Sequence, residues 1–217
     1  MVRDVLLFDL DGTLVDSAGG IATALSQVRA ERDAGPIAAD TVRPWISLGA
    51  DVLVARALGP HAWDSATDLV RFRAILRALP TDAGCLYPGA GRALQTFADS
   101  GFSMAVVTNK PEALSRALLA DLNLLRYFVT VVGGDTAAHA KPDPAPMRHA
   151  LAAIGADPER AMLIGDSAVD AAAAAAFTMP FLLFEGGYGA AECDPEHVAG
   201  RFASFAELPG LVEALVL

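Results

Sequence analysis

The stretch that decides the fold is VLLFDLDGTLVDS, residues 5–17. Its first four residues are apolar and predict a buried strand, yet this strand runs straight into Asp9 and Asp11 and is then broken by Gly12. Carboxylates are among the side chains least often buried without a partner, so they need a reason to stand at the end of a core element. By itself the pattern favours a turn capped by acids; a catalytic site requires matching residues at other strand ends.

Composition restricts the class of protein. A chain of 217 residues that is 53% hydrophobic can bury a sizeable core, and its length suits one domain or a domain with a smaller insert. No apolar run reaches the roughly 18 residues of a membrane span, and the acids near the start are unlike a signal peptide. We therefore expect a soluble protein with no membrane partner.

Charge and cysteine usage narrow the choice further. The net charge of -10 gives most of the surface the same sign as nucleic acid, so we expect no nucleic-acid partner, and an anionic ligand would need local cations. Cys85 and Cys193 lack the spacing of a disulfide framework or a metal site. This favours reduced thiols and a cytoplasmic location.

Strand and helix patterns alternate along most of the chain. Helical stretches such as PEALSRALLADLN (111–123) and DPAPMRHALAAIG (143–155) lie between apolar runs that mostly lack period-two alternation, as expected for strands covered on both faces. This order predicts an α/β fold, a Rossmann-like doubly wound parallel sheet. The expected strands are Val5–Phe8, Ser103–Val107, Val129–Val132, Met162–Ile164 and Phe181–Phe184.

An insert interrupts this order after the first strand. About 70 residues separate Asp9 from the next core helix, where a crossover needs roughly a dozen. Helical spacing is present in IATALSQVRAERD, ADVLVARALG and SATDLVRFRAILRAL, with Gly59 at a helix end. We therefore expect a helical cap domain at 17–83, acting as a lid on a catalytic core formed by 1–16 and 84–217.

Polar residues end three of the strands, in LLFDLDGT, AVVTNK and MLIGDSAVD. The carboxyl ends of parallel strands share one edge of a sheet, so these side chains should gather there. Because crowded carboxylates repel one another unless a cation lies between them, an oxygen-rich set without a histidine cluster favours Mg²⁺. Thr108, the amides after it and Lys141 would then cradle a phosphoryl group. The strand-end set is Asp9, Asp11, Thr108, Asn109, Asp166 and Asp170.

With this set assembled, the chain resembles the haloacid dehalogenase superfamily over nearly its full length. The matching motifs are DLDGT (9–13), VVTNK (106–110), KPDP (141–144) and GDSAVD (165–170). A DxD pair alone is weak evidence, but four motifs in order at strand ends are not. Within that superfamily, YPGA (87–90), VGGD (132–135) and the helical insert resemble the phosphoglycolate phosphatase branch.

The resemblance implies a role for each residue. Asp9 would attack phosphorus and form an aspartyl phosphate, while Asp11 would protonate the leaving alcohol and then activate water. Thr108 and Asn109 would bind phosphoryl oxygens, and Lys141 would neutralise charge. The implied Mg²⁺ ligands are the Asp9 carboxylate, the Asp11 backbone carbonyl and Asp166, with Asp170 either a ligand itself or an anchor behind the ligands.

Several of these residues also have a structural reading. Asp166 could cap the alanine-rich helix that follows it, Thr108 and Asn109 could cap the helix near Pro111, and Lys141 could be a solvated surface residue. In the insert, we select Arg43 as the residue for substrate contact, against the alternative of an ordinary surface arginine.

The sequence thus predicts a Mg²⁺-dependent phosphatase that hydrolyses a small phosphorylated metabolite, 2-phosphoglycolate above others, as a monomer or homodimer. One alternative is a phosphomutase of the same superfamily, whose cap must hold a sugar bisphosphate. A dehalogenase needs no acid at Asp11, so the intact DLDGT argues against it. A non-catalytic phosphate-binding protein is the remaining alternative.

Overall fold

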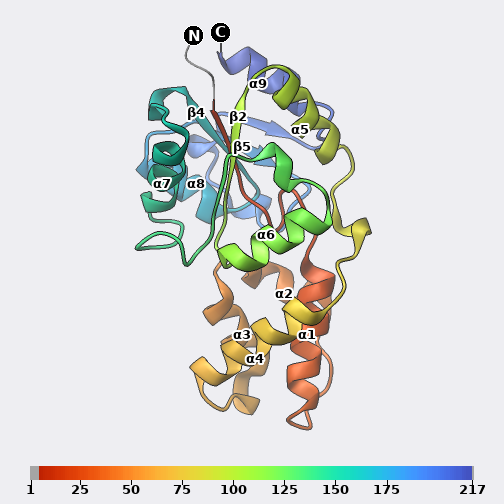
Figure 1. The fold of residues 1–217 in the computed structure, drawn as a ribbon. Coiled ribbons are helices and arrows are strands. Elements are labelled where there is room, and N and C mark those ends of the chain that lie inside the picture. Colours follow the sequence, from red (N-terminus) through yellow and green to blue (C-terminus); the bar gives the residue numbers. More distant parts are fainter. Residues whose placement is uncertain (1–4, 217) are drawn as a thin grey trace.

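The computed structural model describes residues 5–216 and shows an α/β fold in which helices cover both faces of one sheet (Figure 1). The sheet is six-stranded and parallel throughout, in the order β3-β2-β1-β4-β5-β6. This confirms the predicted doubly wound parallel sheet. The strands are β1 Val5–Phe8, β2 Ser103–Val107, β3 Thr130–Val132, β4 Ala161–Gly165, β5 Phe181–Phe184 and β6 Gly200–Phe202.

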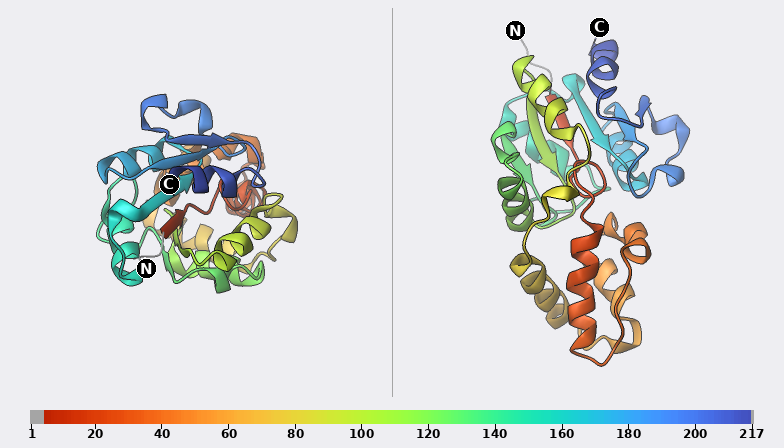
Figure 2. Two further views of the ribbon diagram at one scale, coloured as in Figure 1. Left: turned by 90° about the horizontal axis from the view of Figure 1, so that it is seen from above. Right: turned by 90° about the vertical axis from the view of Figure 1, so that its right-hand side faces the viewer.

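The strands lack alternation because both of their faces are buried. In β1, Leu6 and Phe8 belong to one hydrophobic cluster, whereas Val5 and Leu7 belong to a second cluster on the other face. The first cluster is closed by α5 (Ala90–Asp99), α6 (Glu112–Asp121) and α9 (Leu208–Val216), the second by α7 (Ala145–Ile154) and α8 (Ala168–Ala176). The left view of Figure 2 looks along this sheet and shows the helices around it.

The strand register brings three chain segments out of the sheet at one level. Phe8 of β1 is paired with Val106 of β2 and with Ile164 of β4. The polar residues that follow these strands therefore emerge side by side at the carboxyl edge, as the motif spacing predicts.

A group of four helices lies beyond this edge (Figure 1; right view of Figure 2). They are α1 (Ala18–Ala30), α2 (Ala39–Ile46), α3 (Ala50–Leu58) and α4 (Ser65–Ala78), and they enclose a hydrophobic cluster of their own. Two linking segments, one before α1 and one before α5, join the group to the sheet and lie side by side. The Asp16 N–H donates to the Cys85 carbonyl at 2.7 Å, and the Tyr87 N–H donates to the Leu14 carbonyl at 3.1 Å. A buried ion pair between Arg32 and Asp68 ties the turn after α1 to α4.

Some elements differ from the sequence-based expectation. Strand β3 begins one residue later than predicted, β4 extends one residue further at each end, and β6 was not predicted. Helix α2 was also missed; it contains Pro44, a residue that argues against a helix interior. Gly59 ends α3 with a φ of 50°, and Gly155 ends α7 in the left-handed region, both as predicted. Short 3₁₀ turns cover 59–61, 83–85, 125–127, 158–160, 190–192 and 195–197.

Two helices begin slightly later than the helical stretches 111–123 and 143–155, since α6 begins at Glu112 and α7 at Ala145. Pro111 is the cap that precedes α6, and it does not lie in the first turn. Pro144 caps α7, although the Asp143 carboxylate still accepts the Ala145 N–H at 2.8 Å. Along residues 5–216, no helix has both the length and the apolar character that crossing a membrane requires.

Candidate active site

The strand-end residues predicted from the sequence do come together. A small cavity at the carboxyl edge, of about 10 Å³, is lined by Asp9, Asp11, Thr108, Asn109, Lys141 and Asp170. Asp166 lies beside them, because one of its carboxylate oxygens lies within 4.8 Å of oxygens of Asp9 and Asp170, and all of these residues except Asn109 are buried. Ile46 and Ser47 of the helical group form the opposite wall.

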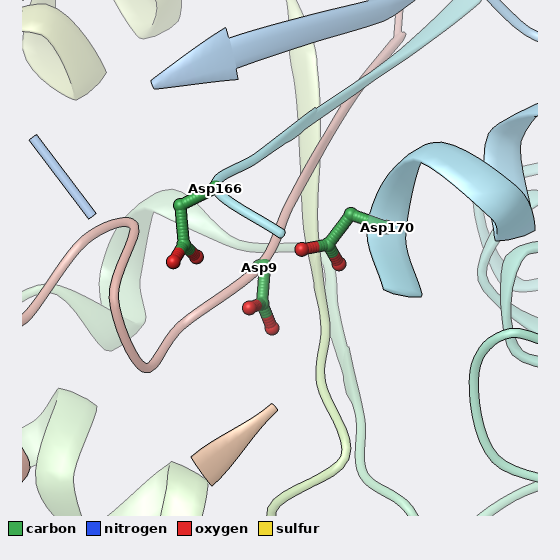
Figure 3. A group of neighbouring side chains, drawn as sticks. All are labelled: Asp9, Asp166 and Asp170. Atoms are coloured by element: carbon green, nitrogen blue, oxygen red, sulfur yellow. The ribbon is translucent and has the colours of Figure 1, made fainter. Parts of the chain in front are cut away.

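Three carboxylates form the centre of the site. Oxygen atoms of Asp9, Asp166 and Asp170 all lie within 4.8 Å of one another, and Figure 3 shows them converging from the end of β1, the end of β4 and the first turn of α8. All three residues are buried, so their mutual repulsion is poorly screened by water. An all-oxygen set of this size fits a hard divalent cation such as Mg²⁺.

Lys141 supplies the one positive charge that touches this trio directly in the described chain. Its Nζ lies 2.8 Å from Asp9 Oδ1 and 2.6 Å from Asp170 Oδ1. Burial alone would lower the pKa of Lys141, but attraction to Asp170 and Asp9 raises that pKa above its usual value. Lys141 is therefore a buried cation and not a solvated surface residue.

Asp170 and Asp166 are held by different partners. The second oxygen of Asp170 accepts the Ser167 hydroxyl at 2.6 Å in a capping box at the start of α8. Ser167, and not Asp166, is thus the helix cap. Asp166 Oδ1 accepts the Thr13 hydroxyl at 2.8 Å, and Oδ2 accepts the Tyr188 N–H at 2.7 Å.

Two glycines allow the chain to pack closely around Asp166. Gly12 has a φ of +90°, and a Cβ there would lie 2.5 Å from Asp166 Oδ2. A Cβ on Gly187 would lie 2.2 Å from Asp166 Cβ. The glycine that breaks the first strand is therefore required both by its backbone conformation and by the carboxylate beside it.

Burial makes the charged forms of Asp9 and Asp166 unfavourable and so raises the pKa of both residues. The pKa of Asp9 is raised from 3.8 to about 7 because burial disfavours its charged form; Lys141 opposes this shift and Asp170 adds to it. The pKa of Asp166 is raised well above 3.8 by burial, then by Asp170 and Asp9. Without a bound cation, the folded site therefore holds protons that the unfolded chain has released.

This predicts how the stability of the metal-free protein depends on pH. A carboxyl group whose pKa is higher in the folded state makes folding take up a proton between about pH 4 and pH 7, so the free energy of unfolding should fall as the pH rises through that window. Because a divalent cation replaces the proton, the rise in melting temperature caused by Mg²⁺ should be larger at pH 8 than at pH 5. Melting curves in EDTA and in Mg²⁺ test this, and an equal Mg²⁺ shift at both pH values would contradict it.

Asp11 has a partner that the sequence analysis missed. Lys110 Nζ lies 3.1 Å and 3.2 Å from the two Asp11 carboxylate oxygens; Asp11 is buried and Lys110 is partly buried. The chain has only two lysines, Lys110 and Lys141, and both contact carboxylates of this site. That use of lysine was visible in the sequence, because VVTNK and KPDP contain them both.

Thr108 and Asn109 lie where predicted, with contacts that the sequence did not indicate. The Asn109 side chain donates to the Ser47 carbonyl at 3.1 Å and to the Lys141 carbonyl at 3.0 Å, and it accepts the Lys141 N–H at 2.9 Å. Asn109 thus joins the helical group to the segment that presents Lys141. Thr108 Oγ1 accepts the Lys110 N–H at 3.2 Å.

Arg43 lies away from the small cavity. Its guanidinium binds Asp16 at 2.7 Å, pairs with Asp40, and lies over the ring of Tyr188. Tyr188 in turn donates its hydroxyl to Asp16 at 2.8 Å. Arg43 therefore contacts the linking segment at the base of the helical group, and its half-exposed side chain fits the surface reading better than substrate contact. The contacts of Tyr188 with Asp16 and Asp166 were not predicted from the sequence.

Comparison with known proteins identifies similar chains. A family model described as haloacid dehalogenase-like hydrolase matches residues 3–178. The phosphoglycolate phosphatase of Rhodospirillum rubrum is 39% identical over 95% of this chain and 88% of its own length. That of Cereibacter sphaeroides is 39% identical over 97% of this chain and 98% of its own.

Solved structures show the same fold. A protein from Haemophilus somnus, described as a predicted phosphoglycolate phosphatase, superposes with a TM-score of 0.84 at 25% identity and covers 96% of this chain and 97% of its own. CbbY from Rhodobacter sphaeroides, solved in complex with phosphate, gives a TM-score of 0.82 at 23% identity over 98% of this chain and 100% of its own. The fold match thus includes the helical group as well as the sheet.

Proposed function

The chain belongs to the haloacid dehalogenase-like hydrolases, and from that membership we propose that it is a Mg²⁺-dependent phosphatase that converts 2-phosphoglycolate to glycolate and phosphate. The observation that carries this proposal is the buried Asp9 carboxylate, held by Lys141 and facing Asp166 and Asp170. The names of the two relatives that are 39% identical support the choice of substrate.

In the first step, a carboxylate oxygen of Asp9 forms a bond to phosphorus while the bond from phosphorus to the alcohol oxygen breaks. Asp11 gives a proton to the leaving oxygen, and in the second step it takes a proton from the water that hydrolyses the aspartyl phosphate. Lys110 holds the Asp11 carboxylate at the edge of the cavity. Thr108, which lines the same cavity as Asp9, would bind the phosphoryl group.

Charge balance follows from the same contacts. Mg²⁺, held by the Asp9 and Asp166 carboxylates and the Asp11 backbone carbonyl, would offset charge on the phosphoryl oxygens. Asp170 has both oxygens engaged, by Lys141 and Ser167, which supports a role as an anchor behind the ligands. Lys141 stays on Asp9 and Asp170, where it offsets charge on the nucleophile and on the phosphoryl group.

We assign residues 17–83 to a cap that opens for substrate and closes for chemistry. In the present arrangement the cavity of about 10 Å³ has room for little more than one water, so a phosphate ester requires the helical group to move. The free thiols of Cys85 and Cys193 support a reducing compartment such as the cytoplasm.

The test is a screen of phosphorylated metabolites with and without Mg²⁺. We expect turnover only with the metal, and a kcat/KM for 2-phosphoglycolate about tenfold or more above that for unrelated esters such as sugar phosphates. Equal kcat/KM values for all esters would contradict the assignment of 2-phosphoglycolate as substrate, but not the assignment of a phosphatase reaction. Absence of Mg²⁺-dependent turnover on every ester would favour a non-catalytic phosphate-binding protein.

A further inference from the structure

Arg73 of the helical group has no partner among the described residues, although part of its side chain is buried. Within residues 5–216, no hydrogen bond, ion pair or ring contact engages Arg73 of α4, and its Nε is buried. Leaving a charged donor unsatisfied is unfavourable. The chain has 26 acidic residues and 16 basic ones, so a shortage of carboxylates does not explain why Arg73 is unpaired.

Other arginines of the group do have partners, apart from the exposed Arg77. Arg29 donates to the carbonyls of Gly35 and Ala57, Arg32 binds Asp68, and Arg71 binds Glu31. These contacts connect α1 and the turn after it with each other and with α3 and α4. Arg73 makes none of them, so it does not serve the internal structure of the cap through polar contacts.

Arg73 lies on the wall of a second small cavity, of about 30 Å³, between the helical group and the sheet. Asp11, Asn109, Lys110 and Ile46 line both this cavity and the one that contains Asp9. A phosphoryl group placed on Asp9 would therefore have its leaving alcohol directed past Asp11 towards Arg73. Most of the other lining residues are apolar, namely Ile21, Leu53, Phe72, Leu76, Pro111 and Leu114.

The two cations of this cavity fit an anion. Lys110 has three donors, of which the two Asp11 oxygens occupy at most two. Arg73 offers a guanidinium, whose geometry matches a carboxylate. Among apolar walls, a carboxylate bound by both would be only weakly screened by water.

From these contacts we propose that Arg73, together with Lys110, binds a carboxylate on the leaving alcohol and so selects phosphomonoesters of short hydroxy acids. This inference rests on the proposed phosphatase function and adds a specificity residue to it. Because the two cavities share Asp11, Ile46, Asn109 and Lys110, a group bound at Arg73 would lie near the phosphoryl group, which suits a carboxylate one carbon from the ester oxygen.

The test compares two esters of similar size, 2-phosphoglycolate and 2-hydroxyethyl phosphate, which carry a carboxylate and a neutral alcohol respectively. In Arg73→Gln, we expect kcat/KM for 2-phosphoglycolate to fall about 10- to 100-fold, the range for loss of a charged hydrogen bond, and kcat/KM for the neutral ester to stay within about threefold. Arg73→Lys should recover part of the loss.

The matched control is Arg77→Gln. Arg77 lies one turn further along α4, is exposed, and lines a different cavity of about 590 Å³. Arg77→Gln should leave kcat/KM for both esters near the wild-type values. An equal loss on both esters in Arg73→Gln, or no loss on either, would overturn the inference.

A binding measurement separates this inference from the proposed function. In the Asp9→Asn background, calorimetry gives the Kd of 2-phosphoglycolate with Arg73 and with Arg73→Gln, independently of turnover. We expect the second Kd to be at least about tenfold larger. Equal Kd values overturn the role of Arg73 even if the wild type hydrolyses 2-phosphoglycolate. If the wild type binds 2-phosphoglycolate but does not hydrolyse it, the proposed function is overturned and the role of Arg73 is not.

Discussion

Replacing Asp9 with asparagine is expected to abolish phosphatase activity, by about four orders of magnitude or more, while making the metal-free protein more stable. The amide cannot attack phosphorus, so no aspartyl phosphate forms. Its shape is nearly that of the carboxylate, and its oxygen can still accept a hydrogen bond from Lys141. Steady-state rates on 2-phosphoglycolate measure the first effect.

The gain in stability follows from the charge of the site. Asp9 is buried, and its pKa is raised to about 7, so at pH 8 the folded protein must hold a carboxylate that is more stable in the unfolded chain. Asparagine removes this unfavourable charge and its repulsion with Asp166 and Asp170. In EDTA at pH 8, we expect a melting temperature at least about 2–4 °C above the wild type, the shift that 1 kcal/mol gives in a protein of this size.

Asp51→Asn is the control for a change of net charge, because Asp51 is exposed on α3. It should shift melting by less than Asp9→Asn does. Retained activity in Asp9→Asn would exclude Asp9 as the nucleophile. Unchanged or lower stability in EDTA would mean that the attraction of Lys141 outweighs the burial of Asp9.

Part of the fold could be predicted because its signals are local. The run Val5–Phe8 followed by DLDGT places an apolar strand and an acidic end next to each other in the chain, and parallel topology then brings Asp9, Thr108 and Asp166 to one edge. Strand β6 has no such signal. It consists of Gly200–Phe202 at the edge of the sheet, and only Phe202 is buried.

The missed contacts are those that depend on tertiary structure. The pattern VVTNK places Lys110 beside Thr108, but its ion pair with Asp11 joins residues 99 positions apart. The bond from Tyr188 to Asp16 spans 172 positions, and nothing in GGYG indicates it. The contacts of Arg43 were not predicted either: its neighbours in space are acids of the linking segment and of α2, and substrate contact through Arg43 stays a prediction.

Lys141→Met should show how strongly the site depends on its buried cation. Removal of one partner from a buried ion pair typically lowers the free energy of unfolding by about 3–5 kcal/mol, because the remaining charge is left uncompensated. Here Asp9 and Asp170 would both lose Lys141, so in EDTA at pH 8 we expect the melting temperature to fall by roughly 6–20 °C. Activity should fall with it, since the phosphoryl group loses the same charge.

Mg²⁺ distinguishes a loss of charge from a loss of packing. If the variant is unstable because three carboxylates repel one another, a divalent cation replaces part of the missing charge, and Mg²⁺ should raise its melting temperature more than that of the wild type. Lys110→Met is the matched control, because it removes the chain's other lysine from Asp11, whose carboxylate is not part of the trio. The rise in melting temperature that Mg²⁺ causes in Lys110→Met should equal the rise in the wild type. A Mg²⁺ shift no larger in Lys141→Met than in Lys110→Met would show that Lys141 acts through packing and not through the charge of the trio.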